Sequence, residues 1–163
     1  EELDHVFLQV RCLAYLCILH RLQGDVAQVK RYLALSEQIV YQDKHLSYIG
    51  VEQTSRAWLA YLDQNWAQAK AQALAALASW DDIFYPFGWL VHWILMAHGL
   101  TKGDLEQARQ AAAEMLDPRQ QRLPDEITAA LEAVARANKT GDLQAGRASM
   151  AQALALAKSH GYL

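Results

Sequence analysis

One short segment constrains the fold of this chain more strongly than any other, because versions of it occur four times. In the segment from Gly103 to Ala108, the glycine is followed by the acidic residue Asp104. An alanine, Ala108, stands four positions after Asp104. Glycine suits the left-handed backbone position just after a helix, and Asp104 can then cap the next helix, with Gln107 at the capping-box position. The alanine supplies a small side chain where two antiparallel helices approach closely. The segment therefore predicts a tight turn between two helices.

The spacing of this segment predicts the architecture. Related turns begin at Gly24, Gln64, Gly103 and Gly141, which are 40, 39 and 38 residues apart. Self-similarity at such a period is the signature of stacked helical hairpins. We therefore predict an all-α fold, a right-handed solenoid of about four antiparallel helix hairpins with a period of about 39 residues. Its turns are expected at 24–25, 64–65, 103–104 and 141–142.

Apolar residues at three-to-four spacing predict eight helices along the chain. They are expected at 2–22, 26–41, 43–63, 65–80, 86–101, 105–116, from Pro124 to the turn at Gly141, and at 143–159. Asp43 is expected to cap the third helix, and Pro86 and Pro124 to stand in the first turns of the fifth and seventh. The first helix is apolar almost all round between Leu13 and Leu19. This predicts that it is buried on two sides or covered by a preceding repeat.

The 163 residues are expected to form one domain, 1–163, in which each hairpin buries its apolar face only against its neighbours. The sequence begins at Glu1 directly in a helical pattern, and its first methionine is Met96. We therefore expect the chain to be a piece of a longer protein.

Composition narrows the choice of partner and compartment. Hydrophobic residues make up 53% of the chain and only three prolines interrupt it, which favours closely packed helices over a sheet. The net charge of −3 is spread evenly, so neither nucleic acid nor an anionic membrane is expected as a partner. No stretch approaches the ~20 apolar residues of a membrane span. Cys12 and Cys17 lie on different sides of one expected helix, so we expect free thiols and a cytoplasmic location.

The period and the turn chemistry resemble those of tetratricopeptide repeats, with a repeat longer than the usual 34 residues. The small position of the second helix falls on Val29, Ala69, Ala108 and Gly146. The later alanine position falls on Ser36, Ala76, Met115 and Ala153. The small position of the first helix, usually glycine or alanine, falls on Cys17, Ala57, Met96 and Val134. This resemblance implies helical hairpins with a concave groove lined by the first helix of each pair.

A more specific resemblance covers residues 84–163. It rests on the segment Leu116–Pro124, the turn Gly141-Asp142 and the ending Ala155–Leu163. These segments resemble the C-terminal repeats of large bacterial signalling proteins, in which a class III nucleotide cyclase or kinase domain and a regulatory ATPase precede helical repeats. MalT-like transcriptional activators have similar arrays. The resemblance implies a sensor or scaffold region, without the cyclase or ATPase chemistry itself.

Candidate catalytic and metal-binding groups are few. His92 and His98 are six positions apart and face different sides of one expected helix, which indicates ordinary histidines and not metal ligands. Asp81 and Asp82 stand together in an expected turn, where acidic side chains cap helices or face water. No phosphate-binding loop or zinc motif occurs. We therefore expect no enzyme activity, no cofactor and no metal site.

The aromatic residues carry the one functional interpretation at residue level. The groove positions of a tetratricopeptide-like array would fall on Trp58, Tyr61 and Trp93, with Arg11 and Arg21 at a cationic end. Trp, Tyr and Arg are the residue types that dominate binding hot spots. The alternative is that the tryptophans fill the core between helices. A groove role requires the aromatic side chains to be partly exposed in the free chain.

These features favour a non-catalytic protein-interaction or scaffold module of a bacterial signalling or regulatory protein. It is expected to bind a peptide or a neighbouring domain in the concave groove. A small-molecule sensor coupled to a regulatory ATPase is the first alternative. A dimerisation module, which forms a homodimer through the first helix, is the second.

Overall fold

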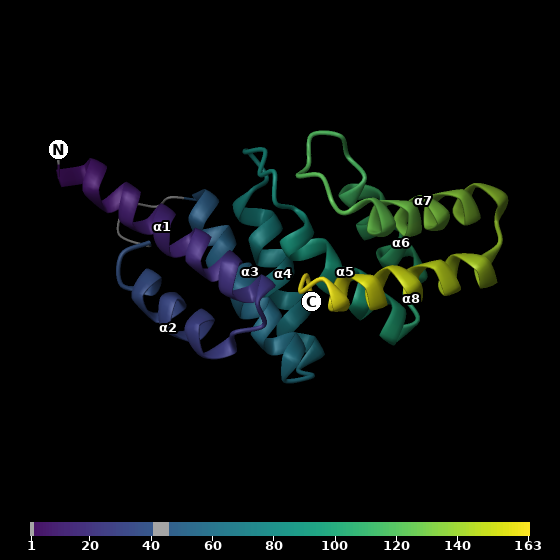
Figure 1. Ribbon diagram of the computed structural model, residues 1–163, viewed down its shortest axis with the longest axis horizontal. Helices are drawn as coiled ribbons and strands as arrows, with labels where there is room; N and C mark the ends of the chain where they lie inside the picture. The colour runs from purple at the N-terminus through teal and green to yellow at the C-terminus, as the bar shows by residue number, and fades with distance from the viewer. Residues whose placement is uncertain (1, 41–45) are drawn as a thin grey trace. The chain divides into compact units, whose positions relative to one another are not determined.

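The computed structural model describes residues 2–40 and 46–163, and within these ranges the chain forms eight α-helices and no strand (Figure 1). The helices are α1 (Glu2–Leu22), α2 (Val26–Glu37), α3 (Leu46–Leu62), α4 (Trp66–Ser79), α5 (Trp89–Lys102), α6 (Leu105–Met115), α7 (Asp125–Thr140) and α8 (Leu143–Ser159). The prediction of an all-α fold is confirmed.

The same kind of turn joins the two helices of each hairpin. One residue of each turn has a positive φ, which is 70° at Gly24, 57° at Gln64, 79° at Gly103 and 72° at Gly141. The side chain of the next residue accepts a hydrogen bond from the backbone N–H three residues later, at 2.9–3.2 Å. These cap residues are Asp25, Asn65, Asp104 and Asp142. All four predicted turns are confirmed.

The predicted end of the second helix is wrong. α2 ends at Glu37, four residues before the predicted position. The chain then turns, and Val40 is fully buried in a small core cluster with Val10 and Ile49. The burial of Val40 explains the early end, since it draws the chain out of the helix and into this cluster. The predicted cap Asp43 lies outside the described residues.

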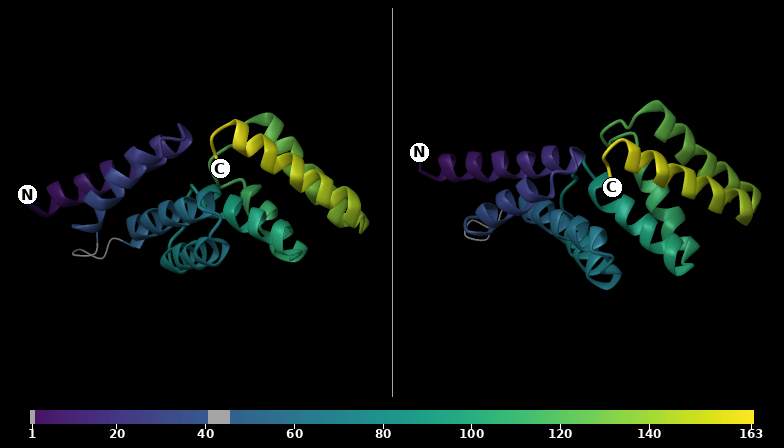
Figure 2. Two further views of the ribbon diagram at one scale, coloured as in Figure 1. Left: turned by 90° about the horizontal axis from the view of Figure 1, so that it is seen from below. Right: turned by 60° about the horizontal axis from the view of Figure 1, so that its bottom comes forward.

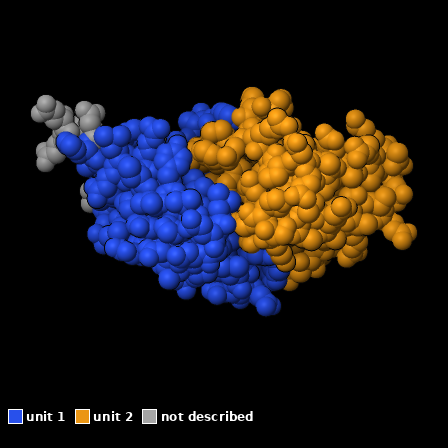
Figure 3. All heavy atoms as spheres, viewed as in Figure 1, with its two compact units in different colours: residues 1–84 blue, residues 85–163 orange. Residues whose placement is uncertain are grey.

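Residues 1–84 and 85–163 form two compact units (Figure 3). In the first unit α1 pairs with α2 and α3 pairs with α4, while α3 also contacts both α1 and α2. The first helices of the two hairpins are therefore neighbours, which is the contact expected of stacked hairpins. The single domain over 1–163 stays a prediction.

Trp80 closes the end of the second hairpin in the first unit. Its indole Nε1 donates a hydrogen bond to the carbonyl of Ser47, at 3.0 Å. The ring lies so close to Gly50 that a Cβ at that position would overlap it. Gly50 is needed here because its missing side chain makes room for the indole, not because of its backbone angles.

In the second unit α5 pairs with α6, and α7 and α8 lie side by side (Figure 2). α6 contacts both helices of the next hairpin, whereas α5 contacts α8. Small residues allow the paired helices to approach. A Cβ at Gly99 would lie 2.6 Å from the carbonyl oxygen of Asp104 and 3.1 Å from the Cβ of Ala108. The close approach predicted at Ala108 is confirmed.

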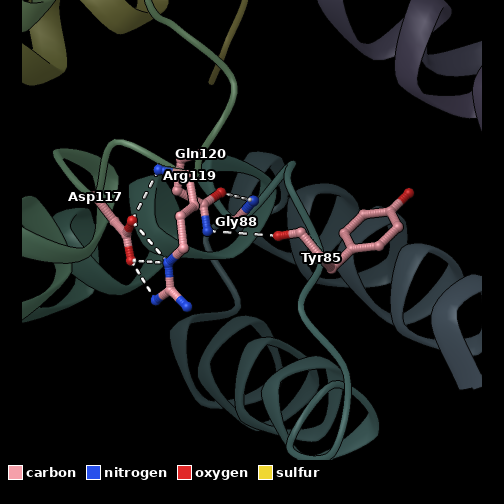
Figure 4. Close-up of polar contacts among 5 residues, drawn as sticks. All are labelled: Tyr85, Gly88, Asp117, Arg119 and Gln120. Carbon is pink, nitrogen blue, oxygen red and sulfur yellow. Dashed lines mark hydrogen bonds and ion pairs between the residues drawn. The ribbon is translucent and has the colours of Figure 1, made fainter.

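The connector between α6 and α7 holds the residues before α5 (Figure 4). Gln120 Oε1 accepts a hydrogen bond from the backbone N–H of Gly88 at 2.7 Å, and Gln120 Nε2 donates one to the carbonyl of Tyr85 at 3.4 Å. Asp117 accepts hydrogen bonds from the backbone N–H and the guanidinium of Arg119. These bonds lower the pKa of Asp117 to about 2. The connector is thus an ordered segment with its own internal ion pair.

The prediction that Pro86 stands in the first turn of α5 is wrong, and contacts with the same connector explain why. The carbonyl of Pro86 accepts a hydrogen bond from the backbone N–H of Gln121 at 2.8 Å, and Gln121 Oε1 accepts one from Trp89 Nε1 at 2.8 Å. Helix α5 consequently begins at Trp89. Pro124 was likewise expected in the first turn of α7. Its ψ of 144° is extended, so Pro124 is the N-cap of α7, one position before the first helical residue.

Candidate interaction surface

The five predicted groove residues divide into buried and accessible side chains. Trp58, Trp93 and Arg21 are 2%, 0% and 1% exposed, whereas Tyr61 is partly buried and Arg11 is exposed. The partial exposure that a groove role requires is therefore not found at Trp58 or Trp93. A binding role for these residues stays a prediction.

Arg21 and Trp58 form an internal contact between α1 and α3. The Arg21 guanidinium carbon lies 5.9 Å from the centroid of the Trp58 ring, within the range of a cation–π interaction. Burial lowers the pKa of Arg21 from 12.5 to about 9. Both residues are predicted groove residues, and the structure brings them together, buried between α1 and α3.

The solvent side of α1 is apolar. Leu8, Tyr15 and Leu19 are 52%, 43% and 48% exposed, and the thiol-bearing Cys12 is exposed as well. Their spacing of four, three and four residues places them on one side of the helix. We call these four residues the α1 outer face. The opposite side of α1 is buried through Val10, Leu13, Ala14, Cys17, Ile18 and Arg21.

Aromatic and cationic side chains flank the α1 outer face. The ring of Phe7 packs edge-on against Tyr48 of α3, with centroids 5.8 Å apart. The Arg11 guanidinium carbon lies 5.7 Å from the centroid of the Tyr15 ring. Of these residues, only Arg11 is a candidate predicted from the sequence. The signal for the others was present, because the first helix is apolar almost all round.

Comparison with known proteins adds no identification. No family model, no curated protein and no solved structure matches this chain. The resemblances to tetratricopeptide repeats and to MalT-like regulators therefore stay predictions.

The two thiols have different environments. Cys12 and Cys17 are both free, as predicted. Burial raises the pKa of Cys17 to about 12, and this outweighs a hydrogen bond with Ser55 that acts in the opposite direction. Because the thiolate is the reactive form, Cys17 is protected from alkylation at neutral pH whereas Cys12 is open to solvent.

The histidines and acidic residues considered above form no cluster. Burial lowers the pKa of His92 from 6.5 to about 4. His98 Nδ1 lies 2.8 Å from the side-chain oxygen of Gln107, so the capping-box residue contacts the neighbouring helix. Asp81 and Asp82 are exposed. In the ranges that the structure describes, no three metal-ligating side chains lie together.

A small cavity lies in the second unit between α6, α7 and α8. Its volume is about 10 Å³, and its lining includes Arg109, Asn138 and Met150. This volume is close to the minimum that holds one water molecule.

None of the helices within 2–40 and 46–163 combines the length and the apolar character needed to cross a membrane.

Proposed function

We propose that this chain is a non-catalytic protein-interaction module that binds a protein partner through the α1 outer face. The observation that carries the proposal is the exposure of Leu8, Tyr15 and Leu19 on one side of a single helix. Soluble proteins seldom expose contiguous apolar side chains, and where they do, the patch usually marks an interaction site. The α1 outer face takes the place of the groove expected from the sequence.

The flanking residues support the same proposal. Tyr, Phe and Arg are enriched in interface cores, and all three types border the α1 outer face. Contacts within the chain restrict them before any partner binds, since Phe7 packs on Tyr48 and Arg11 packs on Tyr15. Side chains already held in place lose less conformational entropy on binding.

We further propose that the hairpins belong to a tetratricopeptide-like, right-handed solenoid of a cytoplasmic bacterial signalling or regulatory protein. Four turns of the same geometry support the repeat, as does the contact of α3 with both helices of the preceding hairpin. The signalling context rests on the resemblance of residues 84–163 stated above. Sequencing the gene upstream of the codon for Glu1 tests the signalling context, because the resemblance implies a cyclase, kinase or ATPase domain there.

The small-molecule sensor is the weaker alternative. The cavity beside Arg109 has the size of one water molecule and does not itself hold such a ligand. Trp58 and Trp93, which the sensor hypothesis would place against a ligand, are buried.

A photo-crosslinking experiment tests the interaction proposal. The residue at position 15 is replaced by benzoylphenylalanine, and the chain is irradiated in an extract of the source cells. The control chain carries the same group at Leu74 of α4, which is 46% exposed. We expect a crosslinked protein band from position 15 that is absent from position 74 and is lost when Leu8→Glu and Leu19→Glu are added. Equal crosslinking from both positions, or none from position 15, would contradict the proposal.

A further inference from the structure

The small cavity of the second unit lies against a buried hydrogen-bond donor. Its volume of about 10 Å³ is close to the minimum for one water molecule, and its lining includes Arg109, Asn138, Gly141 and Gly146. We propose that this cavity is a binding site for a single water molecule, which accepts a hydrogen bond from Arg109 Nε and joins α6 to the end of α7. The site is separate from the α1 outer face, so either proposal can fail without the other.

The guanidinium of Arg109 supplies the donor. Its Nη1 atom donates a hydrogen bond to Asn138 Oδ1 at 3.0 Å, and its Nη2 atom donates one to Glu106 of the same helix. The Nε atom is buried, and among residues 2–40 and 46–163 it has no acceptor. A buried donor without an acceptor costs free energy. A water molecule in the cavity that Arg109 lines removes this cost.

The lining also contains oxygen atoms to which a water molecule can donate. Asn138 and the C-cap Gly141 belong to the last turn of α7, and the last four carbonyls of a helix have no N–H partner within it. Asn138 Oδ1 accepts a hydrogen bond from Arg109 and, like every amide oxygen, has a second lone pair. The cavity therefore meets the requirement of two or more polar partners for a bound water molecule.

Gly146 of α8 leaves room in the cavity. Its φ is not positive, and a Cβ at this position would lie at ordinary contact distances, 3.7 Å from the Cβ of Ala137 and 4.0 Å from Cε of Met150. Alanine would therefore fit, and it favours a helix more than glycine does. The equivalent positions of the other hairpins carry larger side chains, namely Val29, Ala69 and Ala108. A methyl group at position 146 would take up part of the cavity, so glycine here preserves space for the water molecule.

Other occupants fit the cavity less well. Its volume excludes an organic ligand. The guanidinium of Arg109 repels a metal cation, and the carboxylate of Asp142, which also lines the cavity, repels an anion such as chloride. A neutral water molecule avoids both repulsions and can donate and accept hydrogen bonds at once.

Nuclear Overhauser contacts between water and methionine methyl groups test the site. Met150 lines the cavity, whereas Met96 and Met115 are also buried but do not line it, so they serve as controls in the same sample. In the chain labelled with ¹³C-methyl methionine, we expect the methyl group of Met150 to show a contact with water that the other two lack. No contact at Met150, or equal contacts at all three methyl groups, would overturn the inference.

Two substitutions test the space and the donor separately. Gly146→Ala takes up part of the cavity, and Arg109→Leu removes the Nε donor and leaves an apolar lining, which stays dry. We expect both variants to reduce the contact of Met150 with water to the level of Met96, while keeping the wild-type far-UV circular dichroism. The control Arg136→Leu, on α7 at a side chain that is 67% exposed, should leave the contact unchanged. A contact that persists in Gly146→Ala, or that is lost equally in the control, would contradict the proposed site.

A crystal structure of the unchanged chain gives a second readout that needs no substitution. We expect a water molecule at hydrogen-bond distance from Arg109 Nε, about 2.7–3.2 Å, and none at this position in Gly146→Ala. A well-ordered Arg109 whose Nε atom contacts no water molecule, or donates to a protein oxygen instead, would overturn the inference.

Discussion

The side-chain oxygen of Gln120 lies 2.7 Å from the backbone nitrogen of Gly88, a residue 32 positions earlier in the chain. Gly88 is the N-cap of α5 and has no side chain of its own to accept hydrogen bonds at the helix start. Gln120 supplies an acceptor there from the connector between α6 and α7. The start of α5 is therefore fixed by the connector that follows α6.

This relationship predicts the effect of Gln120→Ala. The variant should lower the free energy of unfolding by about 1–2 kcal/mol, because it leaves the N–H of Gly88 without this acceptor. Urea denaturation measures the change. Gln120→Glu keeps an acceptor oxygen and should lose less. Equal stabilities of the wild type and both variants would show that the connector does not hold α5.

Buried tryptophans predict large losses of stability. Trp58→Ala and Trp93→Ala should each lower the free energy of unfolding by about 3–5 kcal/mol, the usual loss for a large buried aromatic side chain. Arg11→Ala, at an exposed position, should change it by less than about 0.5 kcal/mol. Chemical denaturation of the three variants checks the prediction. Losses below about 1 kcal/mol at both tryptophans would support their predicted role as groove residues.

The turn at Gln64 predicts a stabilising substitution. Gln64 has a φ of 57°, in the region where a side chain costs roughly 1–2 kcal/mol. Glycine loses more conformational entropy on folding than glutamine does, which offsets part of this gain. Gln64→Gly should therefore raise the free energy of unfolding by about 0.5–1 kcal/mol. Gly24→Gln, the reverse change at the equivalent turn, should destabilise it. Thermal melts of the pair measure both signs, and equal signs would contradict the shared turn geometry.

His92 predicts a pH dependence of stability. Its pKa falls from 6.5 to about 4 on folding, so the unfolded chain binds a proton between these pH values and the folded chain does not. Stability is therefore highest above pH 6.5 and falls as the pH drops towards 4, by about 3 kcal/mol from this group. His92→Gln should have a shallower pH profile in urea denaturation. Parallel profiles of the wild type and the variant would rule out His92 as the cause.

The local part of the fold could be predicted from the sequence. The turn residues carry their own chemistry, a left-handed position followed by a cap, and this chemistry recurs at a nearly constant period. Even Gln64, where glycine is missing, was predicted from its spacing. The pairing of Gln120 with Gly88 had no such signal, because neither residue type nor spacing links two segments 32 residues apart.

The candidate surface was predicted less well, for a physical reason. Periodicity shows which residues share one side of a helix, but it does not show what covers that side. Trp58 and Leu19 both lie on apolar stripes of their helices, yet one is 2% exposed and the other 48%. The first helix was expected to be buried on two sides or covered by a preceding repeat. In the described residues α2 and α3 bury only one side of α1, so burial on two sides is not found, and cover by a preceding repeat stays a prediction.

Alkylation of Cys12 tests the central claim most directly, because this thiol lies in the middle of the α1 outer face and Cys17 is buried. The rate of reaction with excess iodoacetamide is measured by mass spectrometry for the purified chain with and without a desalted extract of the source cells, at constant reagent and pH. We predict that Cys12 alone reacts in the folded chain, that its rate falls severalfold in the extract, and that Leu8→Glu with Leu19→Glu restores the fast rate. A rate at Cys12 that is the same with and without the extract would contradict the claim that a protein partner binds this face.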